Sequence, residues 1–193
     1  METDVTAPPE SVYARFGKPL LDRLVGLVLA VFTLPILIVL LVMALGAFGW
    51  PPVLRTSRIG RRGTRFNLYK INTRKDHQTD LRGRNMRFSL WLRRTSLDEL
   101  PQLWNVALGH MSLVGPRPLH PFQAAHEDSD LNRRHSLRPG LTGPWQVDAR
   151  GDGRHLTDHL EVDLAYLENL SFRRDLALLA RTVPTLIRHR EEA

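Results

Sequence analysis

The sequence predicts an α+β protein that is mostly helical, with a small β element, one apolar membrane helix and amphipathic helices. Three observations support this prediction: an uncharged apolar run close to the N-terminus, one short stretch of alternating apolar and polar residues, and leucines at helical spacing in the last third of the chain. A length of 193 residues, 42% of them hydrophobic, suffices for one domain and one membrane segment.

The apolar run extends from Leu24 to Trp50 and contains 27 residues without a charge. As a helix rising ~1.5 Å per residue it would be ~40 Å long, which exceeds the ~30 Å hydrocarbon core of a bilayer. A secretory signal is a poor match, because its apolar region has only ~7–15 residues and because Glu2, Asp4 and Glu10 precede the run. We therefore expect a segment that is retained and lies in a membrane.

The course of this segment depends on Pro35 and on the charges at its two ends. A proline in the middle of a helix removes a hydrogen bond and favours a kink. Basic residues flank the run on both sides: Arg15, Lys18 and Arg23 before it, and Arg55, Arg58, Arg61 and Arg62 after it. Because the positive-inside rule places both flanks in the cytoplasm, a helix that enters, bends and returns satisfies the pattern. A kinked, tilted spanning helix is the alternative.

The β element follows the apolar run. Pro51 and Pro52 end the helix, and Gly60 and Gly63 bracket a turn. Residues 66–71 then alternate apolar and polar side chains, as in a half-buried strand.

The C-terminal third predicts two amphipathic helices. The first carries leucines at four-, four- and three-residue spacing, namely Leu156, Leu160, Leu164 and Leu167. The second begins at about Ser171, and its expected apolar face consists of Leu176, Leu179, Val183 and Leu186. The arginines of this last helix could rest on anionic lipid at the membrane interface, or they could form the solvated face of a helix packed on the core.

A helix start is expected around residues 96–101. Ser96 is followed three places later by Glu99, the spacing of a capping box, and Pro101 is tolerated only in a first turn. This pattern places Asp98 and Glu99 at a helix N-terminus, where ordinary first-turn acids are also common.

Asp98 and Glu99 are the candidates for chemistry. The positive end of a helix dipole, together with Arg93 and Arg94 just upstream, should keep Asp98 ionised and attract phosphate. A hard divalent ion bound by Glu99 would neutralise phosphate oxygens and allow one anion to attack another.

Two further motifs follow the acidic pair. Arg117 stands between Pro116 and Pro118, so its backbone is stiff, and its guanidinium could clamp phosphate oxygens or simply be solvated in a surface turn. Residues 139–143 form a glycine-rich turn that could approach a ligand closely, and Arg150 follows it.

The charge distribution and the composition limit the kinds of partner and of chemistry that the chain can have. The net charge is +7, and residues 55–94 contain 13 Lys or Arg against two acids, Asp76 and Asp80. Such a block indicates an anionic partner: nucleic acid, lipid headgroups or the phosphates of a small substrate. The absence of cysteine excludes disulfides, zinc thiolate sites and cysteine nucleophiles.

Residues 94–106 and 111–118, which read RTSLDELPQLWNV and MSLVGPRP, resemble the bacterial sugar transferases known as monotopic phosphoglycosyl transferases. The resemblance includes the proline-bent apolar run and continues on both sides of the two motifs. Upstream it is carried by Lys18, Asp22, Arg58, Ile59, Gly60, Gly63, Phe66, Tyr69 and Lys70. Downstream it is carried by residues 139–143 and 145–147 and by Arg150, Asp163, Tyr166, Asn169, Ser171, Asp175 and Thr182.

The resemblance implies a minimal, catalytic-core form of the family at the bacterial inner membrane. Residues 1–17 would be an N-terminal tail, residues 18–50 a re-entrant membrane helix, and residues 51–193 a catalytic domain on the cytoplasmic face. The implied enzyme passes a sugar 1-phosphate from a UDP-sugar to polyprenyl (undecaprenyl) phosphate and releases UMP. This is the first membrane step of exopolysaccharide, capsule, O-antigen or glycoprotein glycan assembly.

The resemblance also assigns roles to residues. Asp98 would be the nucleophile that forms a covalent phosphosugar, and Glu99 a ligand of Mg²⁺, for which Mn²⁺ could substitute. The phosphate- and substrate-binding candidates are Arg117, Arg93, Arg94, Arg150 and Lys70. Membrane lipids are expected partners, nucleic acid is not, and a homodimer is compatible with the sequence.

Two departures from the family pattern leave alternatives open. Asn72 stands where the family typically has arginine, and His110 where it has an acidic residue. One alternative is therefore a catalytically weak, membrane-anchored scaffold. Another is a binder of anionic lipid or nucleic acid, because aromatic residues lie within the basic block, although no nucleic-acid motif accompanies them.

Overall fold

The computed structural model describes residues 11–73, 84–123, 133–148 and 156–188. The expected structure is confirmed in outline: an apolar helical segment, a small hairpin and then mainly helices. Arg150 lies outside the described residues.

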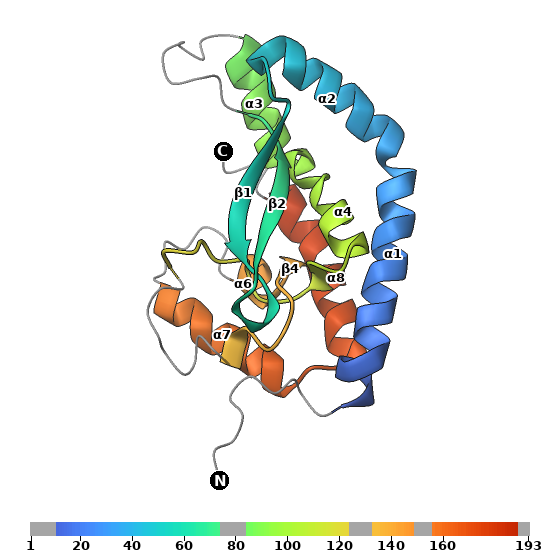
Figure 1. Cartoon of the computed structure of the whole chain (residues 1–193), viewed down its shortest axis with the longest axis vertical. Coiled ribbons are helices and arrows are strands. Elements are labelled where there is room, and N and C mark those ends of the chain that lie inside the picture. The colour runs from blue at the N-terminus through green and yellow to red at the C-terminus, as the bar shows by residue number, and fades with distance from the viewer. Residues whose placement is uncertain (1–10, 74–83, 124–132, 149–155, 189–193) are drawn as a thin grey trace.

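The apolar segment forms a bent pair of helices. A π-helical turn, η1 (Tyr13–Gly17), leads into α1 (Lys18–Phe32), and α2 (Leu34–Phe48) follows at 59°. The two helices form an arc along one side of the molecule (Figure 1). The break is at Thr33, whose hydroxyl donates 2.7 Å to the Leu29 carbonyl, and Pro35 lies in the first turn of α2. The expected bend is therefore confirmed, two residues before the proline.

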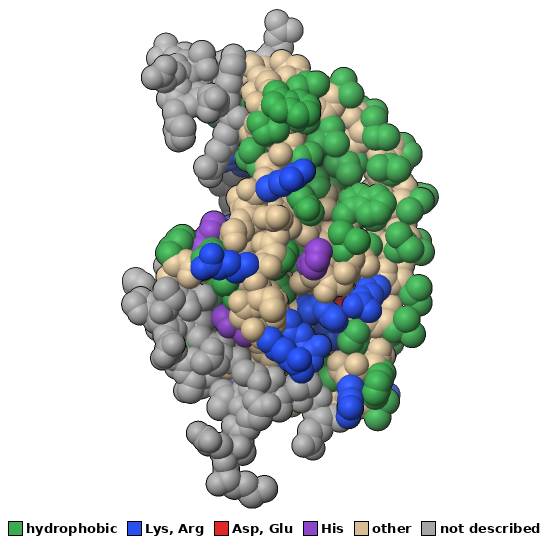
Figure 2. Space-filling view, in the orientation of Figure 1, with side chains coloured by type: hydrophobic (Ala, Val, Ile, Leu, Met, Phe, Trp, Pro, Cys, Tyr) green, Lys and Arg blue, Asp and Glu red, His purple; other side chains and the backbone are tan. Residues whose placement is uncertain are grey.

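The outer face of the arc is apolar. Leu24, Val28, Phe32, Ile36 and Val39 are all more than half exposed, and apolar side chains cover this side of the surface in Figure 2. Within the described residues no single helix has the length and hydropathy needed to cross a bilayer, whereas the bent pair meets both criteria when taken together.

The inner face of the arc packs on the domain. Gly26 lies against α4 (Gln102–Ala107), where an added Cβ would come within 2.7 Å of Val106. One core joins η1 to the C-terminal half and contains Ala14, Leu68, Val106, Met111, Leu113, Val114, Leu137, Tyr166, Leu167, Leu170 and Leu178. A second core lies under α2 and contains Leu37, Leu40, Ala44, Phe48, Ile71 and Leu92.

The expected strand pairs into a hairpin. Strand β1 (Val53–Ile59) runs antiparallel to β2 (Arg65–Ile71), with Val53 opposite Ile71 and Ile59 opposite Arg65. A 3₁₀ turn, η2 (Arg61–Gly63), connects them.

The glycine-rich segment forms a strand instead of a ligand-binding turn. Strand β4 (Gly140–Thr142) runs parallel to β3 (Ser112–Val114), and a Cβ on Gly140 would lie 2.2 Å from the backbone nitrogen of Gly115. The expected approach to a ligand is therefore wrong for Gly140, because the missing side chain makes room for the neighbouring backbone.

The remaining helices are α3 (Arg84–Arg94), α6 (Pro144–Asp148), α7 (Leu156–Glu168) and α8 (Phe172–Arg188). The prediction of two C-terminal helices is confirmed, but the expected apolar face of the last one is partly wrong. Helix α8 buries Asp175 and Leu178, while Leu176 is 56% exposed. The prediction from hydrophobic spacing placed Leu176 on the buried face. It was wrong because the buried face of α8 is built around the carboxylate of Asp175, which a hydrophobic pattern does not include.

Asp175 fastens α8 to the start of α1. Its carboxylate accepts hydrogen bonds from the Tyr13 hydroxyl at 2.7 Å, the Tyr166 hydroxyl at 2.6 Å and Lys18 Nζ at 2.6 Å. Lys18 also pairs with Asp22 at 3.2 Å. Because a buried charge needs partners, this cluster fixes the base of the apolar segment on the C-terminal half.

Candidate active site

The acidic pair lies in a tight turn. Asp98 and Glu99 belong to a 3₁₀ turn, η3 (Leu97–Glu99), just before α4. Leu97 and Leu100 pack against the core under α2, so the turn is held from both ends. Asp98 is only 8% exposed.

The expected capping box does not form. Ser96 has a left-handed backbone (φ 54°) and makes no capping hydrogen bond through its side chain. The Glu99 side chain instead accepts a hydrogen bond from Lys70 Nζ at 2.6 Å. The spacing of Ser96 and Glu99 matches a capping box, but Lys70 on β2 offers Glu99 a stronger, charge-assisted hydrogen bond than a backbone amide does.

Lys70 lies beside the acidic pair, and its expected role in substrate binding stays a prediction. It stands near the end of β2, opposite Leu54 of β1, so the hairpin fixes its position. The Lys70 and Glu99 side chains are 34% and 26% exposed. The pair therefore lies where the buried aspartate meets solvent.

The charge state of Asp98 reflects its surroundings. Burial, and then the neighbouring charge of Glu99, raise the pKa of Asp98 to about 6, although Lys70 and Arg93 act in the opposite direction. The basic neighbours, which were expected to keep Asp98 ionised, do lower its pKa, but desolvation outweighs them. With this pKa, about nine in ten Asp98 side chains are ionised at pH 7, so an anionic carboxylate is still available.

Arg93 and Arg94 have different surroundings. Arg93 Nε donates to Thr73 Oγ1 at 3.0 Å, and the Thr73 carbonyl accepts from Ser89 at 2.9 Å. These contacts hold Arg93 beside the acidic pair. Arg93 lowers the pKa of Asp98, and phosphate binding by Arg93 and Arg94 stays a prediction.

Arg117 projects from a loop whose backbone is well held. The Pro116 carbonyl accepts from the Gly140 amide at 2.8 Å, and the Arg117 carbonyl accepts from the buried Arg134. The exposed Arg117 guanidinium lies 4.0 Å from the centre of the Trp145 ring, a cation–π geometry. The expected stiff backbone at this arginine is thus supported.

Arg58 connects these groups, and the sequence did not assign it to the site. Burial, and then Arg117, lower the pKa of Arg58, while Glu99 acts in the opposite direction, so its charge is near both groups. It donates to the Pro118 carbonyl at 3.3 Å. Strand periodicity could have identified it, because Arg58 and the Lys70 partner Leu54 are four residues apart on β1 and share one face of the hairpin.

The two departures from the family pattern have structural explanations. Asn72 is buried; its side chain donates to the Pro51 carbonyl at 3.0 Å and its amide to the Pro52 carbonyl at 2.8 Å. The His110 ring stacks on Phe66 with centroids 6.1 Å apart. Neither residue contacts the acidic pair in these interactions.

This arrangement of a buried aspartate with a glutamate, lysine and arginines occurs on a chain with known relatives. A family model described as bacterial sugar transferase matches residues 13–189. The chain belongs to the bacterial sugar transferase family. The match includes the bent helices, the hairpin, the acidic turn and both C-terminal helices.

Curated relatives agree with this assignment. The sugar transferase is 32% identical to the UDP-galactose-lipid carrier transferase of Erwinia amylovora over 91% of this chain, but it spans only 41% of that relative. It is 35% identical to an uncharacterized sugar transferase, EpsL, of Bacillus subtilis, over 85% of this chain and 86% of the relative. The chain is also 35% identical to the UDP-glucose:undecaprenyl-phosphate glucose-1-phosphate transferase of Caulobacter vibrioides. This match covers 93% of this chain and 73% of the relative.

The acidic pair suits a hard divalent cation. Magnesium takes oxygen ligands and is commonly held by one or two carboxylates while substrate phosphates provide others. Glu99 would supply such a carboxylate, and the charge of Glu99 that helps to raise the pKa of Asp98 is one that a cation would offset. No group of three or more acidic or histidine residues suited to a metal occurs in the part of the chain that the structure describes.

Proposed function

We propose that this sugar transferase moves a sugar 1-phosphate from a UDP-sugar to polyprenyl (undecaprenyl) phosphate in polysaccharide or glycoconjugate assembly. The observation that carries the proposal is the buried Asp98 beside Glu99, with the cationic side chains of Lys70, Arg93 and Arg58 around the pair. The names of the relatives from Erwinia amylovora and Caulobacter vibrioides, which specify a lipid-carrier acceptor, support it.

The proposed reaction has two displacements. An Asp98 carboxylate oxygen attacks the sugar-linked phosphorus, the bond from that phosphorus to the UMP oxygen breaks, and UMP leaves with the electron pair. An oxygen of polyprenyl phosphate then attacks the same phosphorus, which releases the Asp98 carboxylate and forms the diphosphate product. A covalent intermediate divides a difficult anion-on-anion displacement into two steps that use the same cationic site.

The surrounding cations serve this chemistry in different ways. Arg93 is held by Thr73 close to Asp98, so it is placed to contact the transferred phosphoryl group. Lys70 orients Glu99 through their ion pair. Arg58 and Arg117 extend the positive potential away from the dyad, where the second phosphate of a UDP-sugar would lie. Arg94 and Arg150 remain candidates for more distant contacts.

The function is tested by a panel of UDP-sugars with undecaprenyl phosphate as acceptor. The purified chain should release UMP from at least one donor and form a lipid-linked sugar diphosphate. Release of UMP with no lipid product would contradict the proposed acceptor. Absence of both with every donor would instead favour the scaffold, and retention of lipid binding alone would favour the anionic-lipid binder.

We further propose that Glu99 holds magnesium, or manganese in its place, together with substrate phosphate. The bound ion would neutralise phosphate charge that the arginines only partly offset. Chelation should abolish turnover, and Glu99→Gln should lower kcat about tenfold or more. Electron paramagnetic resonance of Mn²⁺ with a UDP-sugar should show bound metal in the wild type and less in the variant. Full activity in excess chelator would show that the reaction needs no metal ion.

The bent helices are proposed to form a re-entrant segment, with the catalytic domain on the cytoplasmic face of the inner membrane. The 59° bend at Thr33 and the exposed apolar outer face support this. The basic residues on both flanks favour the same side, and UDP-sugars are available there.

Single cysteines test the sidedness, because the chain has none of its own. Exposed Ser11 and Ser57 lie before and after the bent pair, so Ser11→Cys and Ser57→Cys should both resist a membrane-impermeant thiol reagent in intact cells and react in inverted vesicles. Leu34→Cys at the bend should react in neither preparation, since it would lie in lipid. Labelling of the Ser11→Cys variant from the periplasm would show a spanning helix instead.

A further inference from the structure

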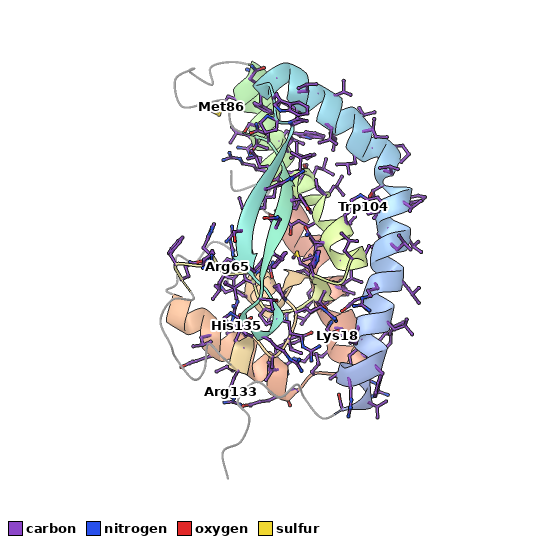
Figure 3. All side chains as sticks on the ribbon, viewed as in Figure 1. Lys18, Arg65, Met86, Trp104, Arg133 and His135 are labelled. Carbon is purple, nitrogen blue, oxygen red and sulfur yellow. The ribbon has the colours of Figure 1, made fainter. Side chains whose placement is uncertain are left out.

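A small cavity lies at the base of α1, away from the acidic pair. Its volume is about 20 Å³, and its polar lining comes from Lys18, Asp22, Arg61, Ser112, Ser136 and Arg138. That is room for about one oxygen-sized atom or water. The base of α1 around Lys18 and the segment around His135 can be followed in Figure 3.

Ser136 leaves a polar group unsatisfied in this cavity. The residue is 1% exposed, and its hydroxyl has no hydrogen-bond partner within the described part of the chain. Its carbonyl, by contrast, accepts from Arg61 Nε at 3.0 Å. Because buried hydroxyls normally have partners, the Ser136 hydroxyl is available to donate to an acceptor that enters the cavity.

The cavity is surrounded by an excess of positive charge. Burial and the charges of Arg23 and Arg61 lower the pKa of Arg138, and Asp22 acts in the opposite direction. The Asp22 carboxylate is already engaged, since it pairs with Lys18 at 3.2 Å and accepts a hydrogen bond from Ser112. The guanidinium groups of Arg61 and Arg138 line the cavity together with Lys18, whereas Asp22 is the one carboxylate in its described lining, and Arg23 is near enough to act on Arg138. An anion would relieve the repulsion among these cations.

The surroundings of the cavity indicate where such an anion would come from. Leu20 and Leu24 on α1 are 60% and 53% exposed, and Leu108, next to the glycine that Arg23 lies against, is 61% exposed. In Figure 2 a group of basic side chains adjoins the lower part of the apolar outer face. Cations at the edge of an apolar surface are suited to lipid headgroups.

This cavity is separate from the acidic pair. Arg61 lies in the turn of the hairpin, whereas Lys70, which binds Glu99, stands at its other end. A strand rises about 3.3 Å per residue, so the seven-residue strands hold the two groups about 20 Å apart.

We propose that Arg23, Arg61, Arg138 and Ser136 form a binding site for the phosphate of an anionic phospholipid headgroup. One phosphate oxygen fills the cavity and accepts a hydrogen bond from the Ser136 hydroxyl. The guanidinium groups bind the remaining oxygens at the cavity mouth, and the acyl chains lie along the apolar face of α1. This site goes beyond the proposed transfer reaction and does not depend on it.

The test uses the full chain in a neutral detergent with short-chain lipids. Dioctanoyl phosphatidylglycerol should bind, as measured by calorimetry, and dioctanoyl phosphatidylcholine, whose headgroup carries no net charge, should bind much more weakly. The double variant Arg61→Gln/Arg138→Gln should weaken phosphatidylglycerol binding about tenfold or more. Ser136→Ala should weaken it by a smaller factor while leaving all the charges in place.

Arg65→Gln is the matched control, because Arg65 is an exposed arginine on the same hairpin, on the side away from α1 (Figure 3). It should bind phosphatidylglycerol like the wild type. Circular dichroism checks that each variant is folded, and UMP release should be unchanged in all of them.

Four results would overturn the proposal. The first is equal binding of both lipids, and the second is an equal loss of binding in the Arg65→Gln control. The third is binding of inorganic phosphate as tight as that of phosphatidylglycerol, which would make the site one for a free anion. If the double substitution abolished binding of undecaprenyl phosphate but spared phosphatidylglycerol, the cavity would belong to the acceptor and the proposal would likewise fail.

Discussion

Replacing Asp98 by asparagine should reduce transfer of the phosphosugar about a thousandfold or more. Asparagine has nearly the same size but no anionic oxygen, so it cannot displace UMP from the donor. The fold should persist for two reasons. Leu97 and Leu100 anchor the turn in the core, and asparagine removes a buried charge whose desolvation disfavours the folded state. Turnover is measured as UMP released in the presence of undecaprenyl phosphate, with circular dichroism as the check on folding.

Glu161→Gln is a suitable control, since Glu161 is an exposed acid on α7. It removes the same charge from the surface and should leave kcat unchanged. If Asp98→Asn kept a substantial fraction of the wild-type kcat, the nucleophile would have to be sought elsewhere and Asp98 would at most bind metal or assist a base.

Removing the Asp175 carboxylate should cause the largest loss of stability. Asp175→Ala leaves Lys18 buried with Asp22 as its remaining partner, removes the acceptor of the Tyr13 hydroxyl, and leaves the Tyr166 hydroxyl with only the longer bond to the Val114 carbonyl. Breaking a buried pair of this kind lowers the free energy of unfolding by about 3–5 kcal/mol. Denaturant titration in detergent, followed by tryptophan fluorescence, measures the change.

Two comparisons make this second prediction specific. Glu168→Gln breaks an exposed pair with Arg133, whose side chains are 58% and 40% exposed, and should cost less than about 1 kcal/mol. Adding Lys18→Met to the Asp175 variant should recover part of the loss, because the unpaired charge is removed. A loss as small as that of Glu168→Gln would show that the buried cluster does not fasten α1 to α8.

The elements that depend on local sequence could be predicted. The apolar run, the bend near Pro35, the strand at residues 66–71 and both C-terminal helices follow from hydrophobic periodicity and proline geometry. The short strand β4 could not be foreseen, because three residues carry little periodicity and its glycines serve a contact with the distant Gly115. The exposure of Leu176 likewise depends on Asp175, whose partners lie far away in sequence.

Some residues of the candidate site could also be predicted from local sequence, whereas others depend on tertiary packing. The acidic pair and Arg117 belong to compact motifs, so the sequence pointed to them directly. The pairing of Glu99 with Lys70 instead of a cap, and the position of Arg58, depend on how the hairpin packs on the turn. The pKa of Asp98 depends on burial, which no local pattern reports.

The covalent phosphosugar on Asp98 is the central claim, and intact-protein mass spectrometry tests it most directly. The wild type, mixed with an accepted UDP-sugar and no polyprenyl phosphate, should gain the mass of one phosphosugar and release UMP in a burst stoichiometric with enzyme. Asp98→Asn should show neither, and adding polyprenyl phosphate should remove the adduct from the wild type. A wild type that turns over normally yet shows no burst and no adduct would contradict the account and indicate direct transfer in a ternary complex.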